Sequence, residues 1–486
     1  MAKYVLSVDQ STQGTKAMIF DEGGRMLARA DLPHRQIVNE AGWVSHDPEE
    51  IYQNTLKVVR MAAEKAGADP AEIACMGISN QRETTVAWDK HTGRPVCDAI
   101  VWQCARAVDV CAAIEQTGIG DLVRDRTGIP ISPYFPAAKT AWILQNVPEA
   151  KALAEKHQLG MGAVDAWLVW KLTGQYKTDY SNASRTQLFN IRTLQWDREI
   201  CAAFGIDADD LPAVTDSDAV FGETDLGGWL QKKIPICGVL GDSHAALFGH
   251  GCVEIGMTKA TYGTGSSIMM NIGPDYAASK NGLVTSLAWK YKGQVSYVME
   301  GNLNYTGAVI TWLKDSLGLI ASAGETEALA KAAHSADTTC LVPAFTGLGA
   351  PYWKSDARAM LCGMSRTTGK NEIVRAALDS IAFQIHDVIA AMEKDTGIRL
   401  PVLRVDGGPT RNKYLMQFQS DMLNTPVSCP DAEELSGIGA AVMAGISAGM
   451  YQADLHTLQY ATFTPCMNSA AREEKLKNWQ MAISRL

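Results

Sequence analysis

Residues 241–250 read GDSHAALFGH and place an acid, a hydroxyl and an imidazole in consecutive positions, Asp242, Ser243 and His244. These are the side-chain types of a hydrolase triad, in which a histidine activates a serine nucleophile. Adjacent residues converge poorly on one another, however, and Ser243 lacks the GxSxG context of a nucleophile elbow. Two other interpretations stay open: Asp242 caps the helix that follows the apolar run 236–240, or it is a single catalytic carboxylate.

Three polar turns have the composition of phosphate-binding loops. DQSTQGTK at 9–16 joins an acid, small hydroxyls and one glycine, so it exposes several backbone N–H groups in a small space, and Lys16 adds charge. YGTGS at 262–266 repeats this chemistry. VDGG at 405–408 ends in two consecutive glycines, and because they have no Cβ atom, a phosphate or a flat ring can approach the backbone there. One such turn is more often a tight hairpin, but three of them favour nucleotide binding.

Two other nucleotide signatures fail. GMSRTTGK at 363–370 has one residue too many between its glycines for a Walker loop, and Asn371 stands where Ser or Thr is needed. GIG at 437–439 lacks the third spaced glycine of a dinucleotide fingerprint.

A second set of side chains could bind a polyhydroxyl compound. Arg82 offers a planar fork of donors and Glu83 a double acceptor, and together they can bind a vicinal diol. Tyr134 has the amphipathic ring that suits a polar pocket, and Trp102 is either a wall of that pocket or part of the core. Taken alone, the Arg–Glu pair is more often a surface ion pair.

The elements that position these residues alternate between strand-like and helix-like runs, which predicts an α/β chain. Residues 4–8 and 16–20 read as a hairpin around the first polar turn, and residues 257–273 repeat that plan in the second half. Apolar spacing predicts a helix over 371–393, another over 437–449 and an amphipathic one in the last sixteen residues. The repeat predicts an N-terminal domain over 1–249, a C-terminal domain over 250–450 and a tail over 451–486.

The bulk properties favour small-molecule chemistry. The chain has 486 residues, a net charge of -9 and 47% hydrophobic residues, so it can bury a large core but is a poor partner for nucleic acid. No run of apolar residues reaches the length of a membrane span, and the eleven cysteines form no CxxC pair. We therefore expect a cytoplasmic protein without membrane insertion, nucleic acid or structural zinc.

Several long blocks resemble the FGGY carbohydrate kinases and, among the branches of that family, the glycerol kinases. They include SVDQ, GISNQRETTVAWDKHTGRP, IVWQC, VDAWLVWKLTG, TDYSNASRTQLFNI, YGTG, LVPAFTGLGAPYW, ALDSIAFQ and LRVDGG. The resemblance implies an α/β fold of two actin-like (ribonuclease H-like) domains with a catalytic cleft between them. It also implies an ATP:alcohol phosphotransferase that binds ATP and Mg²⁺ on its C-terminal half and a small polyol or sugar on its N-terminal half. Members of the family often form dimers or tetramers, so a homo-oligomer is expected.

The same resemblance assigns roles to individual residues. Asp242 matches the general base on the acceptor hydroxyl, and Asp9, with Asp242, matches the residues that hold Mg²⁺. The acceptor-binding set is Arg82, Glu83, Trp102, Tyr134, Asp242, Ser243 and Ser267. The nucleotide-binding set is Thr12, Gln13, Lys16, Gly263, Thr264, Gly307, Thr311, Gly408 and Asn412.

Two departures from the glycerol kinase pattern concern the acceptor pocket. Ser243 stands where those enzymes have glutamine, and Ser267 stands where they have an aromatic residue. Two large groups become two hydroxyls, which predicts a roomier and more polar pocket. The expected acceptor is glycerol or a polyol or ketose of four or five carbons.

Two further alternatives remain. The chain could be an actin-like or chaperone-like ATPase without a carbohydrate acceptor, although the diol-binding set argues against this. Within the family it could be a pentulose kinase such as a xylulokinase.

Overall fold

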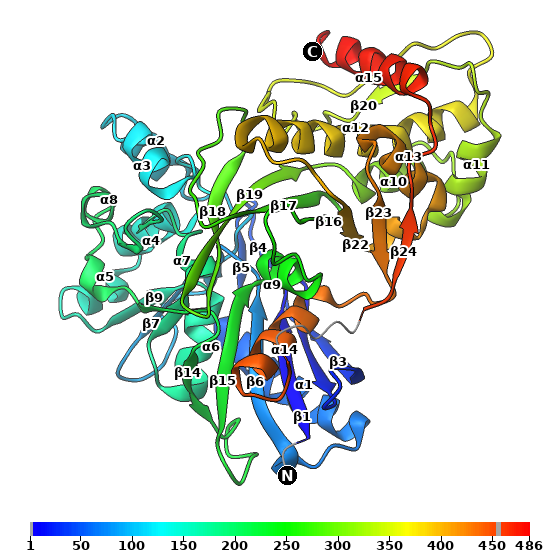
Figure 1. Ribbon diagram of the computed structural model, residues 1–486. Helices are drawn as coiled ribbons and strands as arrows, with labels where there is room; N and C mark the ends of the chain where they lie inside the picture. The colour runs from blue at the N-terminus through cyan, green and yellow to red at the C-terminus, as the bar shows by residue number, and fades with distance from the viewer. Residues whose placement is uncertain (1–2, 453–457) are drawn as a thin grey trace.

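The structure is a computed structural model that describes residues 3–452 and 458–486, and two large sheets dominate it (Figure 1). The six-stranded sheet, in the lower half of Figure 1, has the order β14-β15-β6-β1-β2-β3. Its strands are β1 (Tyr4–Gln10), β2 (Gly14–Phe20), β3 (Met26–Pro33), β6 (Ile73–Asn80), β14 (Val220–Thr224) and β15 (Ile234–Gly241). The seven-stranded sheet, in the upper half, has the order β18-β19-β17-β16-β22-β23-β24. Its strands are β16 (Thr258–Tyr262), β17 (Ser266–Gly273), β18 (Val284–Tyr291), β19 (Gln294–Leu303), β22 (Leu403–Asp406), β23 (Val427–Pro430) and β24 (Tyr460–Phe463).

The two sheets follow one plan, as the repeated hairpin predicts. Each hairpin, β1–β2 and β16–β17, is antiparallel, and its first strand pairs in parallel with a later strand, β6 or β22. In the first sheet, β6 also pairs in parallel with β15, and β15 pairs in antiparallel with β14 at the edge. In the second sheet, β22 pairs in parallel with β23, and β23 pairs in antiparallel with β24 at the edge. The internal duplication is therefore present in the strand order. Parallel neighbours bring their carboxyl ends to one edge, where polar turns meet.

The predicted helices are present with small shifts at their ends. The helix expected at 371–393 is α12 (Lys370–Thr396), which begins where Glu372 accepts from the Gly369 N–H and ends at Gly397, with φ +71°. The helix expected at 437–449 is α14 (Leu435–Ser447), and the C-terminal one is α15 (Ser469–Ile483).

The remaining elements extend the two halves. The other helices are α1 (Pro48–Ala66), α2 (Val108–Glu115), α3 (Gly120–Thr127), α4 (Pro136–Asn146), α5 (Pro148–Ala154), α6 (Val164–Thr173), α7 (Tyr180–Ala183), α8 (Arg198–Ala203), α9 (Asp242–Gly249), α10 (Gly307–Thr311), α11 (Thr326–Ala332) and α13 (Lys413–Leu423). The short strands are β4 (Ile37–Val38), β5 (Val44–His46), β7 (Val86–Asp89), β8 (Ala99–Ile100), β9 (Leu159–Gly162), β10 (Lys177–Asp179), β11 (Phe189–Asn190), β12 (Gln195–Trp196), β13 (Ala213–Thr215), β20 (Cys340–Val342) and β21 (Met360–Cys362).

Helices α9 and α14 join the halves at the centre of the molecule (Figure 1). Helix α9 follows the first sheet but also contacts β16 and β17 of the second, whereas α14 follows the second sheet and packs on β1, β6 and β15 of the first. Their backbones approach so closely that a Cβ atom on Gly439 would overlap the carbonyl oxygen of Ala245, and one on Gly249 would overlap that of Leu435. Helix α14, which the sequence assigns to the C-terminal domain, thus packs on the sheet of the N-terminal half.

Part of the predicted tail, residues 453–457, lies outside the described residues. Within the described ranges, no helix combines the length and apolar character that crossing a bilayer requires.

Candidate active site

Asp242 and Arg82 lie just beyond the carboxyl ends of the neighbouring parallel strands β15 and β6. The Nε atom of Arg82 is 3.3 Å from Oδ1 of Asp242. Arg82 is buried, and Asp242 keeps 35% of its side chain exposed, so the carboxylate remains open to a ligand. The next residue, Glu83, has φ +60°, a strained conformation for a residue with a side chain and one that is common at functional sites.

Arg82 belongs to a buried ion network that connects the two halves. Its two terminal nitrogens donate to the carboxylate of Glu300 on β19 at 3.0 and 2.9 Å. Arg185 completes the network, with Nε 2.6 Å from Glu83 Oε1 and Nη1 2.9 Å from Glu300 Oε2. Burial alone would raise the pKa of Glu300, but the guanidinium groups of Arg185 and Arg82 outweigh it and hold that pKa well below its usual range. The acceptor pair predicted from the sequence is therefore half of a four-residue network.

Trp102 and Tyr134 form an aromatic wall beside this network. Their ring centroids are 5.5 Å apart, and the indole Nε1 of Trp102 donates to Oγ1 of Thr12 at 2.9 Å. That hydrogen bond connects the aromatic pair to the first polar turn. Lys139 lies beneath, buried, and donates to the backbone carbonyls of Tyr134 and Glu83; burial lowers its pKa to about 7.

The two serines that depart from the glycerol kinase pattern differ in their surroundings. Ser267, on β17, donates to Glu300 Oε1 at 3.3 Å and lies 3.5 Å from the Nζ of buried Lys259. Ser243 is in the first turn of α9, where its backbone N–H donates to Asp242 Oδ1 at 2.6 Å. The structure thus brings Ser267 into the network, whereas Ser243 adjoins it only through the backbone.

The triad interpretation of GDSHAALFGH is wrong. His244 is buried, and neither of its ring nitrogens has a hydrogen-bond partner among the described residues, so no Ser–His relay exists. Burial, reinforced by the charge of Arg82, lowers the pKa of His244 well below its usual value. The helix-cap interpretation is also wrong, because α9 begins at Asp242 with Gly241 in the capping position. Of the three interpretations, neither observation contradicts the last, in which Asp242 is a single carboxylate directly after β15.

Asp9, the last residue but one of β1, is a buried carboxylate with few partners. It accepts a hydrogen bond from Ser79 Oγ at 2.8 Å, and burial raises its pKa to about 6 against the opposing effects of Lys16 and Ser79. Lys16, expected to serve phosphate binding, is 3.9 Å from Asp9 but only 2.7 Å from Glu434 Oε2. Gln13 is exposed at the tip of the same turn.

The other predicted nucleotide-binding residues meet at a cavity of about 510 Å³. Its lining includes Gly307, Thr311, Gly408 and Asn412, which come from α10 and from the turn after β22. The second polar turn adjoins this cavity, because the Gly307 N–H donates to the carbonyl of Gly263 at 2.9 Å, and Ala308 donates to that of Thr264 at 3.1 Å. The side chain of Asn412 also caps α13 through the Leu415 N–H and donates to Thr326 Oγ1.

Four buried or half-buried charged residues of this region were missed from the sequence: Arg185, Lys259, Glu300 and Glu434. Glu300 had a usable signal, because it is a lone acid that ends the apolar run 297–299. The others stand among polar neighbours, so nothing in the local pattern marks them as buried.

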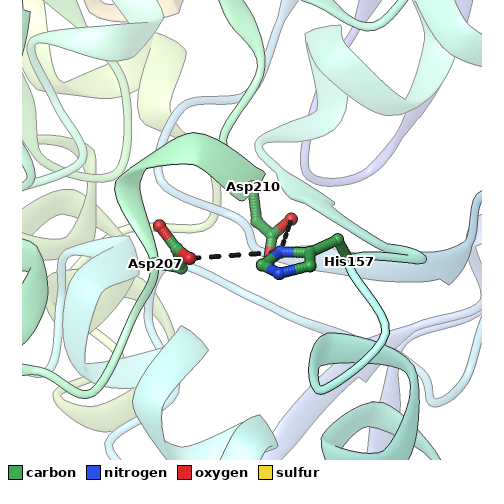
Figure 2. A group of neighbouring side chains, drawn as sticks. All are labelled: His157, Asp207 and Asp210. Atoms are coloured by element: carbon green, nitrogen blue, oxygen red, sulfur yellow. Dashed lines mark hydrogen bonds and ion pairs between the residues drawn. The ribbon is translucent and has the colours of Figure 1, made fainter.

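A separate group of possible metal ligands lies outside these sets (Figure 2). His157 Nδ1 is 3.1 Å from Oδ1 of Asp210 and 4.0 Å from Oδ2 of Asp207. His157 and Asp207 are exposed, and Lys90 lies 3.9 Å from Asp210. We therefore interpret His157, Asp207, Asp210 and Lys90 as a cluster of ion pairs at the surface.

Comparison with known proteins gives one family over nearly the whole chain. Residues 4–249 match the N-terminal domain of the FGGY family of carbohydrate kinases, and residues 258–448 match its C-terminal domain. The chain is 46% identical to glycerol kinase 1 of Thermotoga maritima, with 99% of each chain covered. It is also 46% identical to glycerol kinase of Carboxydothermus hydrogenoformans, with 99% of this chain and 98% of the relative covered.

Solved structures agree with this result. The crystal structure of Plasmodium falciparum glycerol kinase with ADP matches with a TM-score of 0.94 at 35% identity, covering 99% of this chain and 98% of that one. A ligand-bound xylulose kinase from Lactobacillus acidophilus matches with a TM-score of 0.88 at 20% identity, covering 99% and 97% of the two chains, which shows a common fold.

Proposed function

Because this chain belongs to the FGGY family of carbohydrate kinases, we propose that it transfers the γ-phosphoryl group of ATP to a primary hydroxyl of glycerol or a closely related polyol, with Asp242 as the general base. The chain is a kinase of the glycerol kinase type, so the proposal concerns the residues and the acceptor. The observation that carries it is the 3.3 Å contact between Asp242 and Arg82, since Arg82 in turn is held by Glu300 from the other half.

The contact positions a carboxylate for proton transfer. Asp242 accepts the proton of the acceptor hydroxyl as the new O–P bond forms, and ADP leaves as the bond from its β-phosphate oxygen to the γ-phosphorus breaks. Arg82 has five N–H donors, of which two bind Glu300 and the Nε–H lies near Asp242, so the guanidinium keeps donors for acceptor hydroxyls. Trp102 and Tyr134 bound the acceptor on its apolar side.

The nucleotide is proposed to occupy the cavity lined by Gly307, Thr311, Gly408 and Asn412, with its phosphates directed to the two polar turns. Gly408 presents no side chain there, so a flat purine can lie against the backbone. Thr12 and Thr264 supply hydroxyls and backbone groups from the two turns, and Lys16 adds positive charge once it shifts from Glu434.

The carboxylate of Asp9 fits a divalent cation. It is buried, and among the described residues Ser79 is its one side-chain hydrogen-bond donor and Lys16, 3.9 Å away, its nearest cation. The proximity of Asp242 raises its pKa further, so a positive charge between these carboxylates would stabilise both. Mg²⁺ bound there would neutralise charge on the transferring phosphoryl group.

Purified protein tests the proposal in a coupled assay of ADP release with Mg²⁺ and ATP. We expect release to depend on a polyol, and phosphorylated glycerol to appear in the product. ATP hydrolysis at one rate with and without a panel of polyols would instead establish an actin-like or chaperone-like ATPase.

A further inference from the structure

A second cavity of about 330 Å³ borders the buried ion network. Tyr134, Arg185 and Glu300 form its inner end, so it borders the residues already placed around the acceptor. Its outer part lies between residues 130–135 of the first half and residues 346–355 of the second. The cavity therefore adjoins the proposed acceptor residues through Tyr134 and through Glu300, the partner of Arg82.

Two side-chain amides form the polar wall of the cavity. Asn302 is the direct cross-strand partner of Ser267, and because side chains alternate along a strand, it shares a face with Glu300 two residues earlier. Asn304 follows at the end of the strand and also lines the cavity. Neither amide bonds to another side chain or backbone group within the described part of the molecule, so their donors and acceptors are free for a ligand.

The charges around the cavity select a neutral ligand. Arg185 and Glu300 are the charged members of its described lining, and they neutralise each other at 2.9 Å. The lining also has three aromatic residues, Tyr134, Phe135 and Trp353, and the indole Nε1 of Trp353 donates to the Gly282 carbonyl at 2.5 Å. A lining of aromatic rings and amides suits a compound that has both C–H groups and hydroxyls.

We propose that this cavity is the distal part of the acceptor site, and that Asn302 and Asn304 bind the far hydroxyls of an uncharged polyol or ketose of four or five carbons. The inference rests on the proposed kinase function and narrows its acceptor. A cavity of about 330 Å³ beside the acceptor residues leaves room for groups beyond the three carbons of glycerol.

The test is steady-state kinetics with glycerol, erythritol, ribitol and D-xylulose, and with D-gluconate as an anionic probe. It compares the wild type with Asn302→Ala and Asn304→Ala. Asn304 is exposed, so its truncation should not disturb folding. Asn146→Ala, which removes an exposed amide at the end of α4, is the matched control.

We expect at least one four- or five-carbon acceptor to have a higher kcat/KM than glycerol, and gluconate to be inactive. Each asparagine variant should lower kcat/KM for that acceptor by about tenfold through the loss of a hydrogen bond, and by less for glycerol. Asn146→Ala should change neither value. Preference of the wild type for glycerol, or an equal loss for long and short acceptors, would overturn this inference but leave the kinase intact. Absence of transfer to every acceptor would overturn the proposed function itself.

Discussion

Arg82 and Glu300 are joined by two hydrogen bonds of 3.0 and 2.9 Å, although Arg82 follows β6 of one sheet, Glu300 lies on β19 of the other, and 218 positions separate them in the chain. Glu300 is fully buried, so the pair is shielded from water and strongly oriented. Since Arg82 also contacts Asp242, the position of the proposed base depends on a residue of the opposite half. The proposed acceptor site is complete only when the two halves are together.

Replacing Glu300 by glutamine should therefore impair both stability and acceptor binding. The change leaves Arg82 and Arg185 buried with less negative charge, and breaking a buried pair costs about 3–5 kcal/mol. We expect a lower Tm and a raised KM for the acceptor. Asp209→Asn, which removes an exposed pair with Arg198, is the control and should cost under about 1 kcal/mol. Equal effects of the two substitutions would show that the buried network has no special role.

Replacing Asp242 by asparagine should remove the proton acceptor and preserve the shape of the site. General-base catalysis contributes about 10²–10⁴ in rate, so kcat should fall by that factor. Nucleotide binding, followed by calorimetry with ADP, should persist, and Asp209→Asn should leave kcat unchanged. Near-normal turnover of the Asp242 variant would remove this residue from the role of base.

The double substitution Ser243→Gln with Ser267→Phe should shift preference towards glycerol. Phenylalanine at 267 would fill space beside Glu300 and Asn302, where Ser267 now donates to Glu300 at 3.3 Å. We expect the ratio of kcat/KM for glycerol to that for ribitol to rise by about tenfold, as a few lost or gained contacts allow. An unchanged ratio would mean that these positions do not select acceptor length. The single variants separate their contributions.

Gly439→Ala should destabilise the protein far more than Gly437→Ala, although both lie on α14. A methyl group on Gly439 overlaps the backbone of Ala245 in α9, which cannot move without shifting a helix. A methyl group on Gly437 meets the end of the Met18 side chain, which can turn away. Denaturant unfolding should show a loss of about 1–3 kcal/mol for the first and less for the second. Similar losses would contradict the close crossing of α9 and α14.

Asp165→Asn should alter the pH dependence of stability. Burial, followed by the charge of Asp179, raises the pKa of Asp165 to about 7, and one of its oxygens has no partner among the described residues. The folded protein then binds an extra proton between about pH 4 and pH 7, so stability is lost as pH rises through this window. The asparagine variant mimics the protonated form and should be more stable at pH 8, by at most about 4 kcal/mol.

This difference should vanish below about pH 4, where both states of the wild type are protonated. Asp315→Asn, on the exposed surface, should keep the wild-type profile. A constant gap between Asp165→Asn and the wild type at all pH values would contradict the raised pKa.

Local pattern in the sequence was enough to predict the two hairpins and the three late helices. The hairpin around residues 9–16, its repeat at 257–273 and the helix α12 follow from periodicity and turn composition, and the structure has them. The grouping of Gly307, Thr311, Gly408 and Asn412 at one cavity came from the family resemblance. No local rule connects α10 to a turn so far along the chain.

Two features could not be predicted from the sequence: the buried ion network, and the packing of α14 on the sheet of the other half. No apolar pattern in the sequence around Arg185 or Lys259 indicates that they are buried. Arg185 is ion-paired with Glu83 and Glu300, and Lys259 contacts Ser267 on the neighbouring strand, so their burial depends on contacts that form on folding. Likewise, the spacing of α14 shows that it is buried, but nothing in it says that the first sheet is its partner. These features exist only once both halves are folded.

The strand order gives Asp242 a counterpart in the second half. Strand β15 leads to α9 at Asp242, and the equivalent strand β23 leads to α14, which begins directly after Glu434. The first acid contacts Arg82 and remains open to a ligand, while the second is bound by Lys16 and Arg29. The two halves thus use these acids differently: Asp242 keeps 35% of its side chain exposed, whereas Glu434 pairs the start of α14 with Lys16 on β2 and Arg29 on β3 of the first sheet.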